Sequence, residues 1–262
     1  MIIRTQLLVV LASLATLHLA YAAQEKPPLR AQIRVLAFQP DLAIGEAFAH
    51  DPALTKEAAA AAVGVSIPVK SYLNHEFSTV VLTGLRVVFT TQPDHGSLTR
   101  PAELLGEVTL PEGVLSAILL CLPPAADDKA RFQILVIDDS KRAFPAGTFR
   151  ISNLSQQPVR IVLEDKTYQF KPGETKLITD PPVRAGNQSG MQAFALQADV
   201  WQRIGSGIWP HPGKGRVVQV LFTNPATGQV QLRAYDDVPP REPLRASPRE
   251  PLRTPPREPA KR

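Results

Sequence analysis

Cysteine is almost absent from this sequence, in which Cys121 is the single example among 262 residues. A chain with one cysteine cannot form an internal disulfide, so an ordinary hydrophobic core has to hold the fold. Cys121 lies in the apolar run SAILLCL, which predicts a buried side chain rather than a reactive thiol. Between the two unusual ends of the chain remain roughly 215 residues, enough for one large β-domain or two small ones.

Motifs of catalysis and metal binding are also missing. There is no Gly-x-Ser-x-Gly, phosphate-binding glycine loop, dinucleotide fingerprint or Asp-x-Asp-x-Asp-Gly calcium loop. Four histidines lie beyond the N-terminal segment: His50, His75, His95 and His211. Their spacing suits no metal site, and no histidine closely follows Cys121, as a blue-copper site would need. The sequence therefore predicts a non-enzymatic protein with no catalytic residue, no metal site and no cofactor.

Two minority hypotheses stay open. One is a metal or hydrolase site assembled from separate loops, with these members: His50, His75, His95 and Asp94. The other is a calcium site or glycosidase dyad at an acidic pair. The pairs are Asp127-Asp128, Asp138-Asp139 and Asp236-Asp237. The favoured interpretation of each pair is a strand or turn that ends in solvated carboxylates.

Long apolar runs are absent after the first 22 residues, so no later segment is expected to cross a membrane. The N-terminus reads MIIRTQLLVVLASLATLHLAYAA, with a positive charge at Arg4 and a short apolar core over residues 7–15. Ala20 and Ala22 are the small residues of a cleavage site. This pattern predicts a cleaved signal peptide over residues 1–22, with an uncleaved anchor as the rival interpretation. The protein is expected to be exported, to the periplasm, the extracellular space or the cell envelope.

Period-two patterns dominate the body of the chain. Alternating runs are expected to form strands over residues 31–38, 77–84, 85–92, 104–110, 114–122 and 131–138, with one helix over 52–62 capped by Asp51. In the second half, PVRIVLE places Val159, Ile161 and Leu163 on one face, and a hairpin is expected to turn at Pro172-Gly173. The sequence predicts an all-β fold, an antiparallel β-sandwich: two tandem Ig-like-sized sandwiches over 23–140 and 141–238, or one large sandwich.

The stretch FPAGTFRISNLSQQPVRIVLEDKTYQFKPGETKLI has the shape "Phe-Pro-x-Gly, strand, Asn-Leu, strand, Pro-Gly, strand". It resembles a pattern in uncharacterised exported bacterial β-sandwich proteins, a group with no assigned activity. The resemblance covers about thirty-five residues, all of them turn or core positions. It therefore implies a fold and supplies no catalytic residues.

The most distinctive segment of the body is WQRIGSGIWPHPGKG, residues 201–215. An exposed Trp209 in a Gly/Pro-rich loop, with His211 and Lys214 beside it, would offer a stacking surface for a sugar ring or a peptide. In the competing interpretation, Trp201 lies in the core and Trp209 folds back to close one end of a sandwich. The segment is the candidate ligand site.

The end of the chain, residues 239–262, carries three near-copies of one phrase: PREPLRAS, PREPLRTP and PREPAKR. So much proline cannot build a packed core, and polyproline II is the expected local state of a disordered tail. Each of the three copies reads Pro-x-x-Pro-x-basic, which resembles the ligand pattern of SH3 domains. The expected contact residues of the tail are Arg241, Arg245, Arg249, Arg253, Arg257, Lys261 and Arg262.

The formal net charge of +5 is concentrated in this tail, where seven basic residues face three glutamates, so the body is close to neutral. Three roles are open for the tail: a solvated spacer, a cationic arm for an anionic envelope polymer, or a segment for a specific protein partner. A nucleic-acid partner is not expected. The sequence thus favours an exported scaffold or binding protein whose tail acts as a tether or adhesive arm. The alternative is a carbohydrate- or peptide-binding module that uses the Trp209 loop, and a loop-assembled hydrolase comes third.

Overall fold

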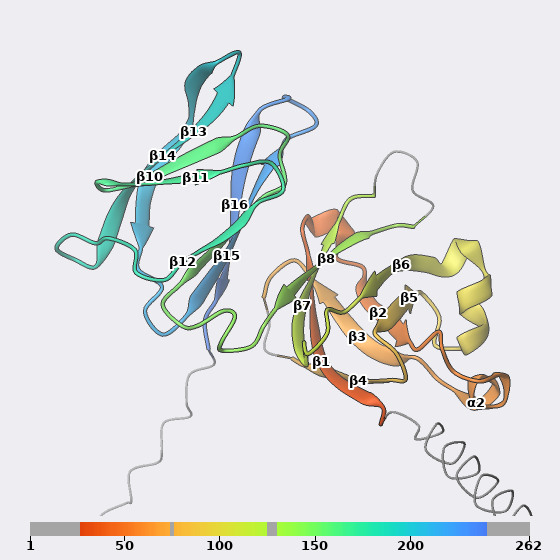
Figure 1. The fold of residues 1–262 in the computed structure, drawn as a ribbon. Coiled ribbons are helices and arrows are strands. Elements are labelled where there is room, and N and C mark those ends of the chain that lie inside the picture. The colour runs from red at the N-terminus through yellow and green to blue at the C-terminus, as the bar shows by residue number, and fades with distance from the viewer. Residues whose placement is uncertain (1–26, 74–75, 125–129, 240–262) are drawn as a thin grey trace, which may run out of the picture.

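The computed structural model describes residues 27–73, 76–124 and 130–239, and strands dominate them, which confirms the all-β prediction (Figure 1). The N-terminal lobe comprises β1 (Leu29–Ala37), β2 (Gly45–His50), β3 (Val65–Lys70), β4 (Ser78–Leu82), β5 (Arg86–Thr90), β6 (Leu104–Thr109), β7 (Ser116–Leu122) and β8 (Gln133–Asp138). Its helical turns are η1 (Pro40–Leu42), α2 (Lys56–Ala61), η2 (His95–Thr99) and η3 (Pro101–Glu103). The C-terminal lobe comprises β9 (Phe149–Asn153), β10 (Val159–Leu163), β11 (Lys166–Phe170), β12 (Thr175–Ile178), β13 (Gln188–Gln197), β14 (Val200–Pro210), β15 (Arg216–Thr223) and β16 (Val230–Asp237).

The N-terminal lobe is one eight-stranded sheet, with strand order β6-β5-β2-β3-β1-β7-β8 and β4 paired to β1. The sheet curls so that its two ends approach: the N–H of Phe132, just before β8, donates to the carbonyl of Leu105 in β6. Cys121 lies inside this curl and is buried, as predicted. Burial raises the pKa of its thiol to about 12, so the side chain acts as a small apolar group.

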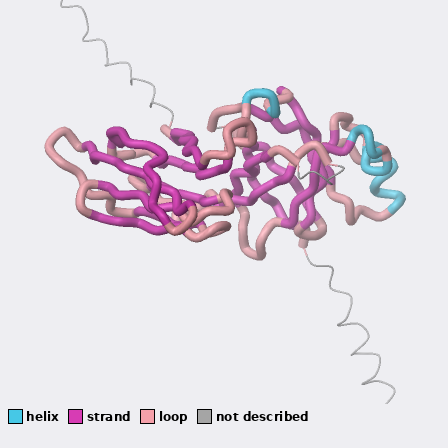
Figure 2. Tube along the Cα trace, turned by 90° about the horizontal axis from the view of Figure 1, so that it is seen from above, coloured by secondary structure: helices cyan, strands magenta, loops and turns pink. Residues whose placement is uncertain are grey.

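The C-terminal lobe has two four-stranded sheets, β11-β10-β13-β14 and β12-β9-β15-β16. The expected alternation of β10 is confirmed, because Val159, Ile161 and Leu163 are all buried in the core between these sheets. Figure 2 shows the two lobes side by side.

Strand β15 belongs to the cores of both lobes. Val217 and Leu221 point into the core of the C-terminal lobe, whereas Val218 and Val220 join the hydrophobic cluster of the N-terminal lobe. The alternation of a strand explains this division, because successive side chains point to opposite faces. The sheet that contains β15 therefore contributes side chains to the hydrophobic cores of both lobes. The division at residues 140 and 141 stays a prediction, and it lies between β8 and β9.

The connections differ from the expectation in several places. Three pairings are parallel (β1 with β3, β1 with β7, and β9 with β15), so the expectation of a purely antiparallel sandwich is wrong there. Pro172-Gly173 does not turn a hairpin: β11 pairs with β10 and β12 pairs with β9, in different sheets. The turn instead carries the chain from one sheet to the other. Conversely, β13 and β14 form a hairpin that the sequence did not predict, turning at Ala198 and Asp199, which both have positive φ.

The predicted helix is shorter than expected and has another cap. It spans Lys56–Ala61, and the Thr55 hydroxyl accepts the Ala58 N–H. The Asp51 carboxylate is instead buried and accepts hydrogen bonds from Ala53 and Thr83. Asp51 therefore joins two loops rather than starting a helix. Across residues 27–73, 76–124 and 130–239, no helix is long and apolar enough for a bilayer crossing.

Candidate functional site: the charged seam between the lobes

Four charged side chains meet where the lobes join, and we call them the seam network: Arg34, Asp139, Arg216 and Asp237. Arg34 comes from the centre of β1, and its guanidinium contacts both carboxylates. Its Nε lies 2.9 Å from Asp139 Oδ2, and its Nη1 lies 2.9 Å from Asp237 Oδ1. The side chains of Arg34, Asp139 and Asp237 are almost fully buried. A mutually neutralised cluster of this kind is the form in which a protein interior tolerates charge.

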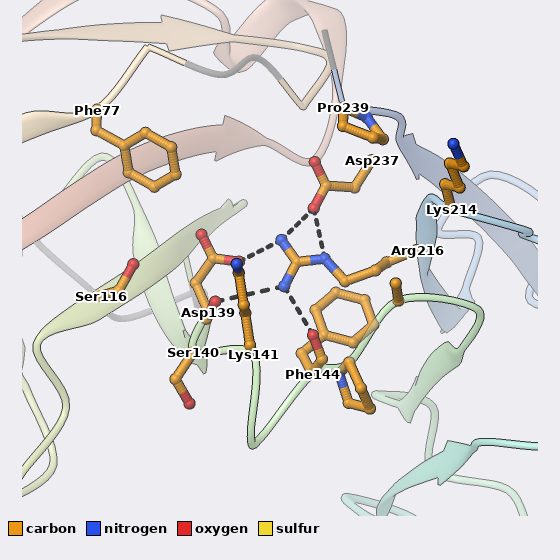
Figure 3. A pocket seen from close by; sticks show the side chains of 12 residues that line it. Phe77, Ser116, Asp139, Ser140, Lys141, Phe144, Lys214, Arg216, Asp237 and Pro239 are labelled. Carbon is orange, nitrogen blue, oxygen red and sulfur yellow. Dashed lines mark hydrogen bonds and ion pairs between the residues drawn. The ribbon is translucent and has the colours of Figure 1, made fainter.

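Arg216, at the start of β15, closes the network from the C-terminal lobe (Figure 3). Its Nε donates to Asp237, and its Nη2 donates to both Asp139 and Asp237. Its Nη1 donates to the carbonyls of Asp139 and Phe144. These five bonds match the five N–H groups of a guanidinium, so Arg216 has no donor left for a ligand. The charge of Arg216 therefore stabilises the folded protein.

The attraction within the seam network outweighs the cost of burial. Burial by itself disfavours the charged form of Arg34, yet hydrogen bonds from its guanidinium to Asp237 and Asp139 raise its pKa. Burial likewise works to raise the pKa of Asp237, but the hydrogen bond and charge of Arg34, with the charge of Arg216, lower it. Both shifts favour the charged forms of Arg34 and Asp237 in the folded protein.

A pocket of about 670 Å³ opens beside the seam network (Figure 3). Phe77, Phe144 and Pro239 form apolar parts of its lining, and Lys141 and Lys214 bring positive charge to it. Since the arginine and aspartate groups on its floor are satisfied by one another, the lysines are the charged groups that remain available to a ligand. Pro239 also marks the point at which the described chain ends, so the tail begins at this pocket.

A second contact joins the lobes at a place away from the seam network. The backbone carbonyl of Phe38, just beyond β1, accepts hydrogen bonds from the Tyr235 hydroxyl and from Arg233. The Phe38 ring meets the Phe222 ring edge to face, with centroids 4.8 Å apart, and the Arg233 guanidinium lies over it. The two lobes are therefore joined by two separate contacts, the seam network and the contacts around Phe38.

Trp209 is buried, as in the second of the two interpretations, although it lies on a strand and Trp201 is not in the core. It lies on β14, is 8% exposed, and packs on Phe149 with ring centroids 5.1 Å apart. His211 is half-buried, with Nδ1 accepting the Gly213 N–H, whereas Lys214 is exposed and lines the seam pocket. A binding role for these three residues stays a prediction, but the indole ring of Trp209 offers no stacking surface. The expected tail contacts lie outside the described residues.

The loop histidines converge in part. His50 is buried, with Nε2 2.9 Å from Thr90 Oγ1, and its ring lies 6.0 Å from that of His95. Ser97 is also fully buried, and it donates to Thr90 rather than to a histidine. His75 and the pair at 127–128 lie outside the described residues, and within those residues no group of three or more His, Cys, Asp or Glu could hold a metal ion.

Acidification is expected to destabilise the fold through His50. Burial is the largest cause that lowers the pKa of His50 from its ordinary 6.5; the Gln92 carbonyl opposes it, His95 adds to it, and Asp94 opposes it. The unfolded chain therefore binds the proton more readily. The contribution of His50 to stability is therefore complete above pH 6.5 and is lost as the pH falls through the folded-state pKa.

Urea unfolding at about pH 7.5 and about pH 5.5 measures this loss, because a free histidine titrates between those values. The variant His50→Gln lacks the titrating group. Its free energy of unfolding should therefore fall less between the two pH values than that of the native protein. An equal loss in both proteins would assign the pH dependence to other groups.

The chain matches no known protein-family model, and no curated protein sequence is significantly similar to it. The functional argument therefore depends on the geometry of the molecule. The acidic pairs illustrate what sequence patterns miss: Asp139 and Asp237 were expected to be solvated, and this is wrong, since both are buried in the seam network. One sequence signal was available, because Arg34 interrupts the apolar run AQIRVLAF at a position where a charge needs a buried partner.

Proposed function

We propose that this protein is an exported, non-enzymatic scaffold of the cell envelope or periplasm, whose rigid β body presents a basic, proline-rich tail. The tail acts as a tether that binds an anionic envelope polymer. We take the body as two tandem sandwich-sized units, of which the C-terminal lobe, with two sheets around one core, is the clearer example. The tail is taken to be disordered.

The observation that carries the proposal is the seam network. The most strongly charged cluster among the described residues is occupied internally, with every N–H of Arg216 bonded to the protein itself. Such a cluster stabilises the joint between the lobes and leaves no arginine free for substrate. The net positive charge of the chain then lies mainly in the tail, where seven basic residues follow position 239.

Binding to purified cell-wall sacculi tests the tether. The mature chain, residues 23–262, is expected to co-sediment with sacculi at low salt and to be released at about 1 M salt, where the Debye length is about 3 Å. A full-length variant in which the seven basic tail residues become glutamine is expected to stay in the supernatant. The chain that stops at Val238 should behave like this variant.

A matched control raises the charge of the same tail. The substitutions E242Q, E250Q and E258Q remove its negative charges, so this variant should need more salt for release than the native chain. If the native chain and the variant without basic tail residues sediment alike, the body carries recognition and the tether is wrong. If neither the native chain nor the variant without basic tail residues sediments, the envelope polymer is not the partner.

A second candidate function, binding of a carbohydrate or peptide by the C-terminal lobe, is favoured by a different tryptophan from the one expected. Trp201 lies on the outer face of the sheet β11-β10-β13-β14, next to Phe194 and Arg160. The aromatic surface suited to stacking is therefore on this face rather than at Trp209.

A further inference from the structure

The outer face of the sheet β11-β10-β13-β14 carries an aromatic cluster that faces away from the core of its lobe. Arg160 on β10 lies directly opposite Phe194 on β13, and Trp201 on β14 lies opposite Leu196, the next outward residue. The alternate residues of β13, Ala193 and Ala195, point inward and are buried. We call Arg160, Phe194 and Trp201 the outer aromatic face.

This face is open to solvent. The polar side chains that share it, Gln169, Gln192 and Arg203, are exposed. Ile208 on β14 is 67% exposed, which leaves apolar surface along the same strand. A hollow of about 350 Å³ adjoins the face, lined in part by Val162 and Gln192. The sheet thus offers an extended surface rather than a closed cavity.

Arg160 is held between two rings. Its guanidinium lies 4.8 Å from the centroid of Phe194 and 4.7 Å from that of Trp201. Its Nε–H is buried and has no hydrogen-bond partner among the described residues. Tryptophan and arginine are the residues most enriched at the centres of binding surfaces, and an orphaned buried donor is costly unless a ligand satisfies it.

We propose that the outer aromatic face binds the proline-rich copies of this chain's own C-terminal tail. Each copy contains Pro-Arg-Glu-Pro, as in residues 240–243, 248–251 and 256–259. Proline rings pack on aromatic side chains, and a polyproline II strand is already ordered, so it loses little entropy on binding. The proposal goes beyond the tether function and does not depend on envelope binding.

The charges of the two surfaces are complementary. The glutamate of each copy, such as Glu250, can accept a hydrogen bond from Arg160, and the backbone carbonyls of a polyproline II strand are also free acceptors. The exposed Asp199, two residues before Trp201, is placed to pair with the arginine that precedes that glutamate. The glutamates, which dilute the positive charge of the tail, thereby acquire a specific role.

The distance to be covered selects which copies can bind within one chain. The last described residues lie at the end of the lobe opposite the β13–β14 turn (Figure 1). Gly215, in the loop that follows β14, packs against Val238. From Pro210 back to Trp201, nine residues of strand span about 30 Å. At about 3.1 Å per residue, the first copy reaches only about 12 Å from Pro239, whereas the second and third reach about 37 and 62 Å.

Docking within one chain is also favoured by concentration. A tethered segment of suitable length is present at a local concentration on the order of 1 mM, so even a weak contact is populated. The second and third copies meet this condition and the first does not. The experiment therefore compares the first copy, which is too close to Pro239 to reach the face, with the second and third copies.

The test follows the indole N–H signals of the mature full-length chain by ¹⁵N NMR. The protein has two tryptophans, so the outer Trp201 reports on the tail and the buried Trp209 serves as an internal reference. The variant Trp201→Phe assigns the two peaks. Two sets of tail substitutions are compared: P240A/E242A/P243A in the first copy, and P248A/E250A/P251A with P256A/E258A/P259A in the other two.

The second set is expected to shift the Trp201 peak, while the first set leaves it in place and Trp209 stays unchanged in both. Equal peaks in all proteins, or an equal shift from the first copy, would overturn the proposal. A Trp201 shift that grows with protein concentration would indicate the tail of a second copy and would also overturn docking within one chain. If only soluble cell-wall fragments move the peak, the face binds sugar instead.

Discussion

Replacing Arg34 with methionine should lower the free energy of unfolding by about 3–5 kcal/mol, the cost of breaking a buried ion pair by removing one partner. The substitution keeps a long apolar stem but leaves the buried carboxylates of Asp139 and Asp237 with Arg216 as their remaining cation in the seam network. Two negative charges then share one positive charge in a site where both carboxylates are almost fully buried. Urea unfolding, followed by circular dichroism, measures the loss.

The matched control is an arginine on another strand of the same lobe that is exposed rather than buried. Arg86 begins β5 and pairs with Glu107, and both side chains are more than half exposed. Arg86→Met should therefore change the stability by less than about 1 kcal/mol. The double variant Arg34→Met with Asp237→Asn restores neutrality and should recover part of the loss. A loss as small at Arg34 as at Arg86 would contradict the structural role of the seam network.

Replacing Asn153 with alanine is expected to cost about 3 kcal/mol, because several buried groups lose partners that are each worth about 1–3 kcal/mol. Asn153 is fully buried at the end of β9. Its side-chain amide donates to the carbonyls of Gln157, Phe170 and Lys171, and its carbonyl accepts from Ser155. One side chain thus fastens the turn after β9 to the end of β11. Thermal or urea unfolding measures the effect.

Asn224 provides the comparison for this position. It also caps a turn, with its side-chain carbonyl accepting the Ala226 N–H, but its hydrogen bonds are open to solvent. Water can replace the lost partners there, so Asn224→Ala should cost less than about 1 kcal/mol. Similar losses of stability in Asn153→Ala and Asn224→Ala would mean that burial does not determine the cost of losing these hydrogen bonds.

The sequence patterns predicted strands well where each strand alternates or is strongly apolar. The buried face of β10 and the burial of Cys121 follow from local patterns and are confirmed. Strands β2 and β3 were missed: GEAFAH has few β-branched residues, and VSIPVK contains Pro68, a residue type that is rare inside strands. Pro68 is accommodated although it cannot donate to a neighbouring strand.

Long-range partners could not be predicted, for a physical reason. Arg34 is separated by 105 residues from Asp139 and by 203 residues from Asp237. No local periodicity links positions so far apart, and each aspartate alone resembles an ordinary strand end. The loop expected around Trp209 was wrong for a related reason: the glycines around it suggested a loop, but β13 provides a partner strand as far as Pro210.

The sharing of β15 between the two cores has a consequence for the order in which the molecule is completed. A chain that emerges N-terminus first presents Arg34 and Asp139 long before β15 and β16 exist. Until those last strands arrive, the N-terminal lobe lacks Val218 and Val220 from its core and Asp237 from its charge balance. Contacts of such long sequence separation form slowly. We therefore expect the core and the charge balance of the N-terminal lobe to be completed only once β15 and β16 have joined it.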